Sequence, residues 1–271
     1  MADIDQHAAR PLTAAWAKRA QGWLLPLAVL LIWETVVAQQ WVSAHLLPPP
    51  SELAHTLLEL TRSGALLAHI GVSVARVLAG FAIGAALAVA LGAAVGLSPR
   101  VEALIDPSFQ ALRAIPSLAW VPLLLLWLGI DEAPKLTLIA IGAFFPVYLN
   151  LVAGIHNVDR KWVEVGRVHG LRTGALIGRV FLPAALPHVL TGLRGGLSLA
   201  WMFLVAAELM AATRGLGYLL TDGRETGRAD LVLVAIGVLA VLGALSDSLL
   251  RLLETRWLAW RDVALTQEAQ P

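Results

Sequence analysis

The sequence predicts an all-α membrane protein with about six transmembrane helices. Apolar residues make up 58% of its 271 residues, charged residues only 14%, and the mean hydropathy is +0.74. An ordinary soluble domain carries charge on about a quarter of its residues, which excludes that class. A helix needs roughly 20 apolar residues to cross a bilayer core of about 30 Å. The segments that meet this requirement are residues 23–42, 70–97, 108–128, 136–155, 193–212 and 231–250.

Composition also excludes several function classes. The chain has no cysteine, so disulfides, thiolate catalysis and cysteine-ligated zinc are absent. Its seven histidines form neither a His-Glu-x-x-His motif nor an i, i+4 pair, and we expect no metal site. The net charge of +1 and the short, scattered basic clusters give no reason to expect nucleic-acid binding.

The first apolar segment, residues 23–42, has two interpretations. Lys18 and Arg19 precede it and residues 42–44 faintly resemble a cleavage site, as in a secretory signal peptide. Five more apolar segments follow, which favours a signal anchor. Glu34 within the segment is costly in lipid, so we expect it to face protein or water.

The basic residues predict the orientation, because cytoplasmic loops are enriched in Lys and Arg. They gather before the first span, after the last span, and between the fourth and fifth spans. That side is therefore predicted to be the cytoplasm, with cytoplasmic tails over residues 1–22 and 251–271 around a membrane domain over residues 23–250. The basic residues on this side are Arg10, Lys18, Arg19, Arg100, Arg160, Lys161, Arg167, Arg172, Arg179, Arg256 and Arg261. The opposite loops hold Arg62, Lys135, Arg214, Arg224 and Arg228.

Between the first two spans, the proline-rich residues 47–51 cannot continue a helix. Ser51 is expected to cap an amphipathic helix over residues 52–61 that lies on the outer surface. In the second span, two Gly-x-x-x-Gly pairs at residues 80–84 and 92–96 predict close approach of another helix.

Prolines interrupt the third and fourth spans at Pro116, Pro122 and Pro146. Proline kinks a helix and frees carbonyl groups. Such kinks suit the lining of a transport pathway, and a merely bent structural helix explains them equally well.

The loop over residues 156–192 is the longest water-soluble stretch between two spans. Asp159 is a good N-cap for a helix over residues 160–169, and Gly170 is placed to end it. Thr173 is expected to cap a second helix over residues 174–181, which Leu182-Pro183 would end. Both helices are short, so their apolar faces must dock on the chain itself, on the lipid interface or on a partner protein.

Within this loop, Glu164 is followed six places later by Gly170, and after nine residues by Val180-Phe181-Leu182-Pro183. This pattern resembles the EAA signature of permeases in binding-protein-dependent ABC importers. Val165, Gly166 and Val180 depart from it, and Gly166 weakens a helix by about 1 kcal/mol relative to alanine.

The resemblance extends from about residue 46 to residue 260. The stretches "SVARVLAGFAIG", "LRAIPSLAWVPLLLLWLGIDEAPK" and "LPAALPHVLTGLRGGLSLAWMFLVAAEL" are similar to the permease branch that serves aliphatic sulfonates, taurine and nitrate. "LWLGIDEAPK" and "GIHNVDRKWVEVGR" are most similar to the aliphatic sulfonate permeases. The resemblance implies a type I ABC importer fold, a homodimer, cytoplasmic ABC ATPase partners and a periplasmic solute-binding protein.

Carried over by residue, the resemblance implies that Glu164, Gly170, Leu182 and Pro183 couple the permease to the ATPase. Further residues expected on this docking surface are Trp162, Val165, Arg167 and Val168. The chain has no Walker A loop, because none of its three lysines follows a glycine, and no Gly-x-Ser-x-Gly motif. We therefore expect a non-catalytic subunit that binds no cofactor, with ATP and Mg²⁺ on the partner ATPase.

The transport pathway is harder to place. Arg76 and Glu208 lie at similar depths, so an ion pair between them is expected, either structural or with a role in gating or anion passage. Arg113, expected near the inner end of the third span, either attracts an anion or reaches lipid phosphate. Other candidate pathway residues are Ser117, Trp120, Asn150, Ser198 and Trp201.

Two other classes stay open. A secondary transporter would use Glu34, Glu208 or Asp247 as a proton-linked carboxylate, although the sequence shows no inverted repeat. A membrane scaffold would explain the loop but not the proline-rich spans. Within the ABC importers, taurine, nitrate or another small solute is the alternative to aliphatic sulfonates.

Overall fold

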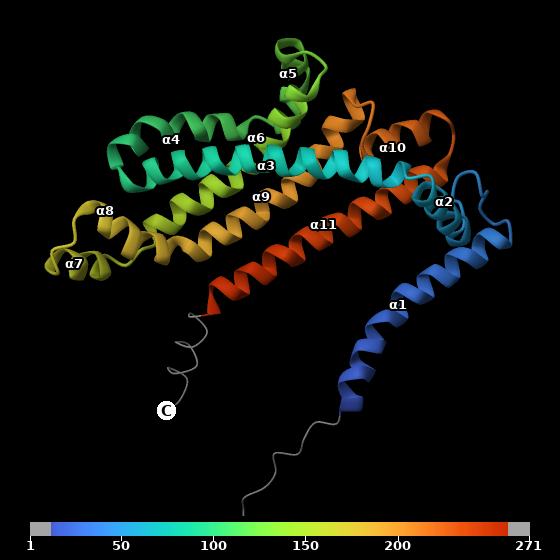
Figure 1. Cartoon of the computed structure of the whole chain (residues 1–271), viewed down its shortest axis with the longest axis horizontal. Coiled ribbons are helices and arrows are strands. Elements are labelled where there is room, and N and C mark those ends of the chain that lie inside the picture. Colours follow the sequence, from blue (N-terminus) through green and yellow to red (C-terminus); the bar gives the residue numbers. More distant parts are fainter. Residues whose placement is uncertain (1–11, 260–271) are drawn as a thin grey trace, which may run out of the picture.

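The computed structural model describes residues 12–259, which are largely helical and contain no strand (Figure 1). The predicted all-α class is confirmed for this part of the chain. In chain order the elements are α1 (Leu12–Ala38), α2 (Pro50–Arg62), α3 (Ala65–Leu97), α4 (Pro99–Ala114), the 3-10 helix η1 (Ser117–Trp120), α5 (Val121–Leu128), α6 (Glu132–His156), α7 (Arg160–Val168), α8 (Thr173–Leu176), the π-helix η2 (Ile177–Phe181), α9 (Leu182–Ala211), α10 (Leu216–Glu225) and α11 (Ala229–Trp257).

Four helical stretches of the described chain are long and apolar enough to cross a membrane. They are α3, α6, residues Thr173–Met210 and α11. The pair formed by α4 and residues Ser117–Leu128 qualifies only jointly and is bent by 89° at its break, and Leu24–Ala38 is a shorter apolar helix. These six stretches correspond in order to the six predicted spans.

The core is formed by α3, α6 and α9. Glycines of α3 contact α6 in register: a Cβ at Gly80 would meet Ile139, and one at Gly96 would meet Ile155. Gly84 lies directly against the Ala140 carbonyl. The close approach predicted from the glycine spacing is therefore confirmed, and the partner is α6.

This register shows that α3 and α6 run in the same direction. Residues 98–131 between them must therefore carry the chain back along the length of α3. The kink predicted at Pro116 is confirmed as an 89° bend. The predicted bounds 108–128 are wrong, because α4 already begins at Pro99 and the chain breaks at Ile115, which has extended backbone angles (φ −75°, ψ 123°). Pro116 disfavours a helical conformation in the residue before it, which explains the break.

Several predicted boundaries are also wrong. α1 ends at Ala38 rather than at residue 42, and α11 continues past residue 250 to Trp257. Hydropathy does not detect the polar turns at helix ends, which explains these shifts. Of the predicted tails, residues 1–11 and 260–271, with Arg10 and Arg261, lie outside the described residues.

The expected Ser51 cap is also wrong. α2 begins at Pro50, and no side chain caps it. Ser51 instead donates from Oγ to Glu34 Oε1 at 2.8 Å and from its backbone N–H to Glu34 Oε2 at 3.1 Å. Glu34 therefore faces protein, as expected from the cost of a carboxylate in lipid.

Candidate functional site

The predicted site residues gather mainly near two opposite ends of the molecule (Figure 1). We call these the α7 end, which holds α7 and α8, and the α10 end, which holds α10 and the start of α3. The long helix α9 connects them.

At the α7 end, local sequence signals determine the backbone of α7. The Asp159 carboxylate accepts a hydrogen bond from the Lys161 N–H at 2.9 Å, and Asp159 is the N-cap of α7. Gly170 has φ +75°, the left-handed conformation that favours glycine after a helix. Both predicted helix signals are confirmed.

The apolar side of α7 is exposed. Trp162 is 65% exposed, Val165 49% and Val168 85%, and Glu164 and Arg167 are exposed beside them. The interpretation in which this face docks on the chain's own surface is therefore wrong. The face is left for lipid or for a partner protein.

Next to this exposed face, α7 packs closely on α8 at Gly166. Gly166 is buried, and a Cβ there would lie 2.8 Å from Leu176 Cδ1. The departure of Gly166 from the EAA pattern therefore has a packing reason, since this glycine lets α7 approach Leu176.

The second predicted helix does not stop at Leu182-Pro183. α8, η2 and α9 form one continuous helix from Thr173 to Met210, and Thr173 is not its side-chain cap. Pro183 follows the π-helical turn, and wide turns of this kind accommodate interruptions of the regular α-helical ladder. Phe181 packs against the core cluster of Leu151, Ile155 and Ala185, while Leu182 and Pro183 are exposed.

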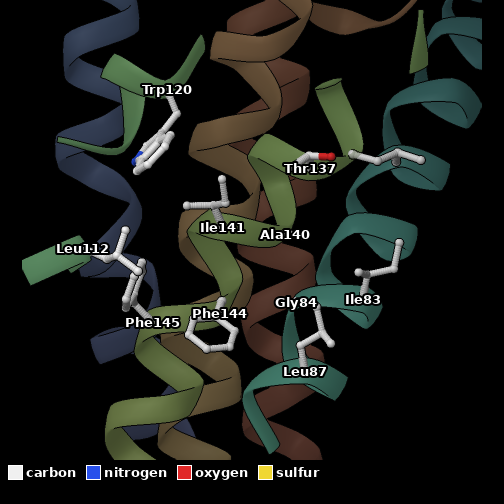
Figure 2. Close-up of a pocket in the computed structure, with 11 residues that line it drawn as sticks. Ile83, Gly84, Leu87, Leu112, Trp120, Thr137, Ala140, Ile141, Phe144 and Phe145 are labelled. Carbon is white, nitrogen blue, oxygen red and sulfur yellow. The ribbon is translucent and has the colours of Figure 1, made fainter. Parts of the chain in front are cut away.

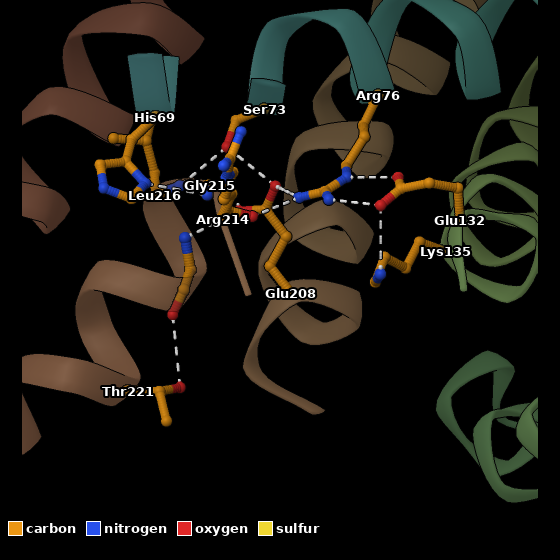
Figure 3. Close-up of polar contacts among 11 residues, drawn as sticks. His69, Ser73, Arg76, Glu132, Lys135, Glu208, Arg214, Gly215, Leu216 and Thr221 are labelled. Atoms are coloured by element: carbon orange, nitrogen blue, oxygen red, sulfur yellow. Dashed lines mark hydrogen bonds and ion pairs between the residues drawn. The ribbon is translucent and has the colours of Figure 1, made fainter. Parts of the chain in front are cut away.

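At the α10 end, the predicted ion pair between Arg76 and Glu208 is present, with Nη1 and Oε1 2.8 Å apart (Figure 3). Arg76 also binds Glu132 through Nε at 2.7 Å and Nη2 at 2.6 Å, and it donates from Nη1 to the Arg214 carbonyl at 2.6 Å. Arg76 and Glu208 are buried. The pair thus belongs to a network that joins α3, α6 and α9.

The same network caps α10. Three successive N–H groups at the start of this helix donate to side chains: Gly215 to His69 Nδ1 at 3.0 Å, Leu216 to Ser73 Oγ at 2.8 Å and Gly217 to Glu208 Oε2 at 2.8 Å. These are the groups that a helix start otherwise leaves without partners. Gly215 has φ +124°, and a Cβ there would overlap the Glu208 carboxylate.

The sequence did not identify the other members of this network. Hydropathy begins the fourth span only at residue 136, which places Glu132 and Lys135 in the loop before it. Ser73 and His69 contact the network from α3. The sequence of α3 does not show which of its faces points into the protein. One signal for this part of the network is present in the sequence: Glu132 and Lys135 are opposite charges three residues apart, a spacing that favours an ion pair on a helix.

The remaining candidate pathway residues do not lie together. Trp120 lines an apolar hollow of about 480 Å³ between α3 and α6 (Figure 2). Ser198 and Trp201 line a smaller hollow of about 160 Å³ between α9 and α11, where Arg194 and Asp247 form an ion pair. Asn150 Nδ2 donates to the Pro146 carbonyl at 2.8 Å within α6, and Ser117 begins η1.

Arg113 is not near the α7 end, where it was expected. It lies in the last turn of α4, which begins at Pro99, and is exposed. At 1.5 Å per residue, Arg113 is about 21 Å along this helix from its start. The broken third span explains the error, because α4 supplies its first half.

Most of the chain matches one known protein family. Residues 66–258 match the family described as "Binding-protein-dependent transport system inner membrane component". The chain is 44% identical over 247 residues to the "Putative aliphatic sulfonates transport permease protein SsuC" of Bacillus subtilis, a match that covers 91% of this chain and 88% of that protein. It is 41% identical over 254 residues to the protein of the same name in Escherichia coli, covering 94% and 97% of the two chains.

A third relative differs in its named substrate. The "Taurine transport system permease protein TauC" of Escherichia coli is 37% identical over 240 residues, which cover 86% of this chain and 87% of the relative. The family match extends from the start of α3 to the end of α11 and so includes both ends of the molecule. The chain therefore belongs to the family of inner membrane components of binding-protein-dependent transport systems.

Proposed function

We propose that this multi-pass membrane protein is the permease subunit of an ABC importer for aliphatic sulfonates in a bacterial inner membrane. Two copies form the permease, a periplasmic solute-binding protein delivers the substrate, and cytoplasmic ATPase subunits hold ATP and Mg²⁺. In this assignment the α7 end and both termini lie in the cytoplasm and the α10 end faces the periplasm. The substrate class is supported by the two sulfonate permease relatives, and taurine is the second candidate because of the third relative.

The exposed apolar face of α7 is the observation that supports ATPase coupling most strongly. Trp162, Val165 and Val168 form this face, and α7 packs on α8 through Gly166 and Leu176 while the face stays exposed. Glu164 and Arg167 add charges at its edge. An exposed apolar patch rimmed by charge is typical of a protein contact. Leu182 and Pro183 are exposed nearby and extend the proposed docking surface.

The coupling assignment is tested with Gly170→Pro and Glu164→Lys in the assembled transporter. We expect both variants to insert into the membrane but to lose copurification of the ATPase and transport. Gly227→Pro is the matched control, since Gly227 also has a positive φ (+69°) and lies at the α10 end. Wild-type copurification of the ATPase with Gly170→Pro would contradict the assignment.

The substrate assignment is tested by uptake into proteoliposomes that contain the ATPase and the binding protein. We expect uptake of ethanesulfonate that needs both partners and ATP, and that exceeds uptake of taurine or nitrate at equal concentration. Uptake without ATP, driven by a proton gradient, would instead indicate a secondary transporter. The contacts of the carboxylates count against that class, because Glu208 and Asp247 are both paired with arginine.

A further inference from the structure

Two buried cations at the α10 end share one exposed carboxylate. The side chains of Arg76 and Lys135 are 7% and 6% exposed, whereas that of Glu132 is 55% exposed. Both cations bind the same oxygen, Glu132 Oε1, at 2.6 Å from Arg76 Nη2 and 3.3 Å from Lys135 Nζ. Figure 3 shows Glu132 approaching the two cations from α6.

Arg76 does not depend on Glu132 for its position. Its Nη1 group binds Glu208 at 2.8 Å and the Arg214 carbonyl at 2.6 Å. This leaves the edge formed by Nε and Nη2, which holds the Glu132 carboxylate through two parallel bonds. Such a fork fits carboxylates and other planar or tetrahedral oxyanions equally well. The fork therefore stays in place if Glu132 moves away.

The charge balance favours a replacement anion. Without Glu132, the positive charges of Arg76 and Lys135 face only the negative charge of Glu208, and a buried charge without a partner is costly. More than half of the Glu132 side chain already contacts solvent, so the carboxylate has room to move away, and an incoming anion would replace its bonds to Arg76 and Lys135. The site lies at the first turn of α6, where the helix dipole also favours an anion.

We propose that Arg76 and Lys135 form a binding site for a small oxyanion, which the Glu132 carboxylate occupies in this conformation. A sulfonate carries the same single negative charge and would displace Glu132 into solvent. The choice of a sulfonate as the natural ligand rests on the proposed function, whereas oxyanion binding itself does not. Glu132 then acts as a competitor that the substrate must displace.

The proposal is tested by calorimetric titration of the full transporter, without ATP, in nanodiscs of zwitterionic lipid, so that anionic headgroups do not compete. Ethanesulfonate and inorganic sulfate are the probes. We expect Glu132→Ala to bind both anions at least about tenfold more tightly than the wild type, because the competing carboxylate is gone. Adding Lys135→Met to Glu132→Ala should abolish this gain.

The matched control adds Arg62→Ala to Glu132→Ala, which removes an exposed positive charge on α2 without touching the network. This control should keep the tighter binding. The proposal is overturned if folded Glu132→Ala binds no more tightly than the wild type, or if Lys135→Met does not reduce its affinity. Tighter anion binding by Glu132→Ala in a transporter that imports no sulfonate would support this site and reject the proposed substrate.

Discussion

Glu208 shows how a single carboxylate is accommodated inside an apolar protein. It is 1% exposed and accepts hydrogen bonds from Arg76, Ser73 and the Gly217 N–H. An ionised group without such partners is strongly disfavoured in the interior. One residue thus connects α3, α9 and the start of α10, and its neighbours must fit around it.

Removing one member of the central ion pair should cost more than removing both. We expect Arg76→Ala to lower the free energy of unfolding by about 3 kcal/mol, because Glu208 then loses its main charged partner. The double variant Arg76→Ala/Glu208→Ala should regain part of this loss. Thermal unfolding in detergent and uptake assays measure the two effects. Equally poor transport by both variants, at unchanged protein levels, would show that the pair does not explain the role of Arg76.

Gly215 is predicted to tolerate no side chain. Gly215→Ala should lower the free energy of unfolding by about 2 kcal/mol or more, because it combines a positive φ with overlap on the Glu208 carboxylate. Gly227→Ala is the control, since Gly227 has φ +69° but open space around its Cβ position. Equal losses in thermal unfolding for the two variants would show that backbone strain alone is responsible.

At the scale of elements, glycine placement determines which helices approach each other. The spacing of Gly80, Gly84, Gly92 and Gly96 in the sequence predicted a close helix contact but not its partner. The glycine spacing within one helix shows which of its faces lacks side chains. Which other helix packs on that face depends on contacts between residues far apart in the sequence. The structure adds that α6 is this partner and that it runs parallel to α3.

Gly84 provides a test of this contact. Gly84→Ala places a Cβ against the Ala140 carbonyl, which belongs to the backbone and cannot move aside easily. We expect a lower thermal unfolding temperature and less folded protein. Gly71→Ala on the same helix has open space and gains the same helix propensity of up to about 1 kcal/mol. The difference in thermal unfolding temperature between the two variants measures the cost of the clash between α3 and α6. Equal unfolding temperatures would contradict the close contact of Gly84 with Ala140.

Other elements could not be predicted from hydropathy. α10 is short and half polar, so it gives no span signal. The break at Ile115 lies beside Pro116, which predicts a kink there, but hydropathy does not give the size of the bend. The ion pair of Arg76 with Glu208 was predictable because both are rare charges at matching depth. Lys135 was not, since its burial depends on Glu132 and on the packing of α6. The sequence makes Trp120 and Trp201 equal candidates for one transport pathway, because it does not reveal that they line different hollows.

At the scale of the whole molecule, the parallel register of α3 and α6 requires the chain between them, residues 98–131, to cross the membrane once. If α4 and α5 instead formed a re-entrant loop, residues 100 and 131 would lie on the same side of the membrane. The chain has no cysteine, so single cysteines report the side directly.

We expect Ser63→Cys and Asp131→Cys to react with a membrane-impermeant maleimide added outside intact cells. Arg100→Cys and Thr173→Cys should react only after the membrane is permeabilised. All four residues are exposed in the structure, and the cysteine-free parent gives the background. Labelling of Arg100→Cys and Asp131→Cys from the same side would show that α4 and α5 do not cross together.

The helix from Thr173 to Met210 is continuous through its π-helical turn and can act as a lever between the two ends of the molecule. Its 38 residues span about 57 Å, from the α8 turn that holds α7 to the carboxylate of Glu208. A tilt of about 5° around one end of such a rod moves the other end by about 5 Å, more than the length of an ion pair. If the proposed ATPase moves α7, a displacement of this size is sufficient in scale to open the charged network at the far end, with no relay of side chains in between.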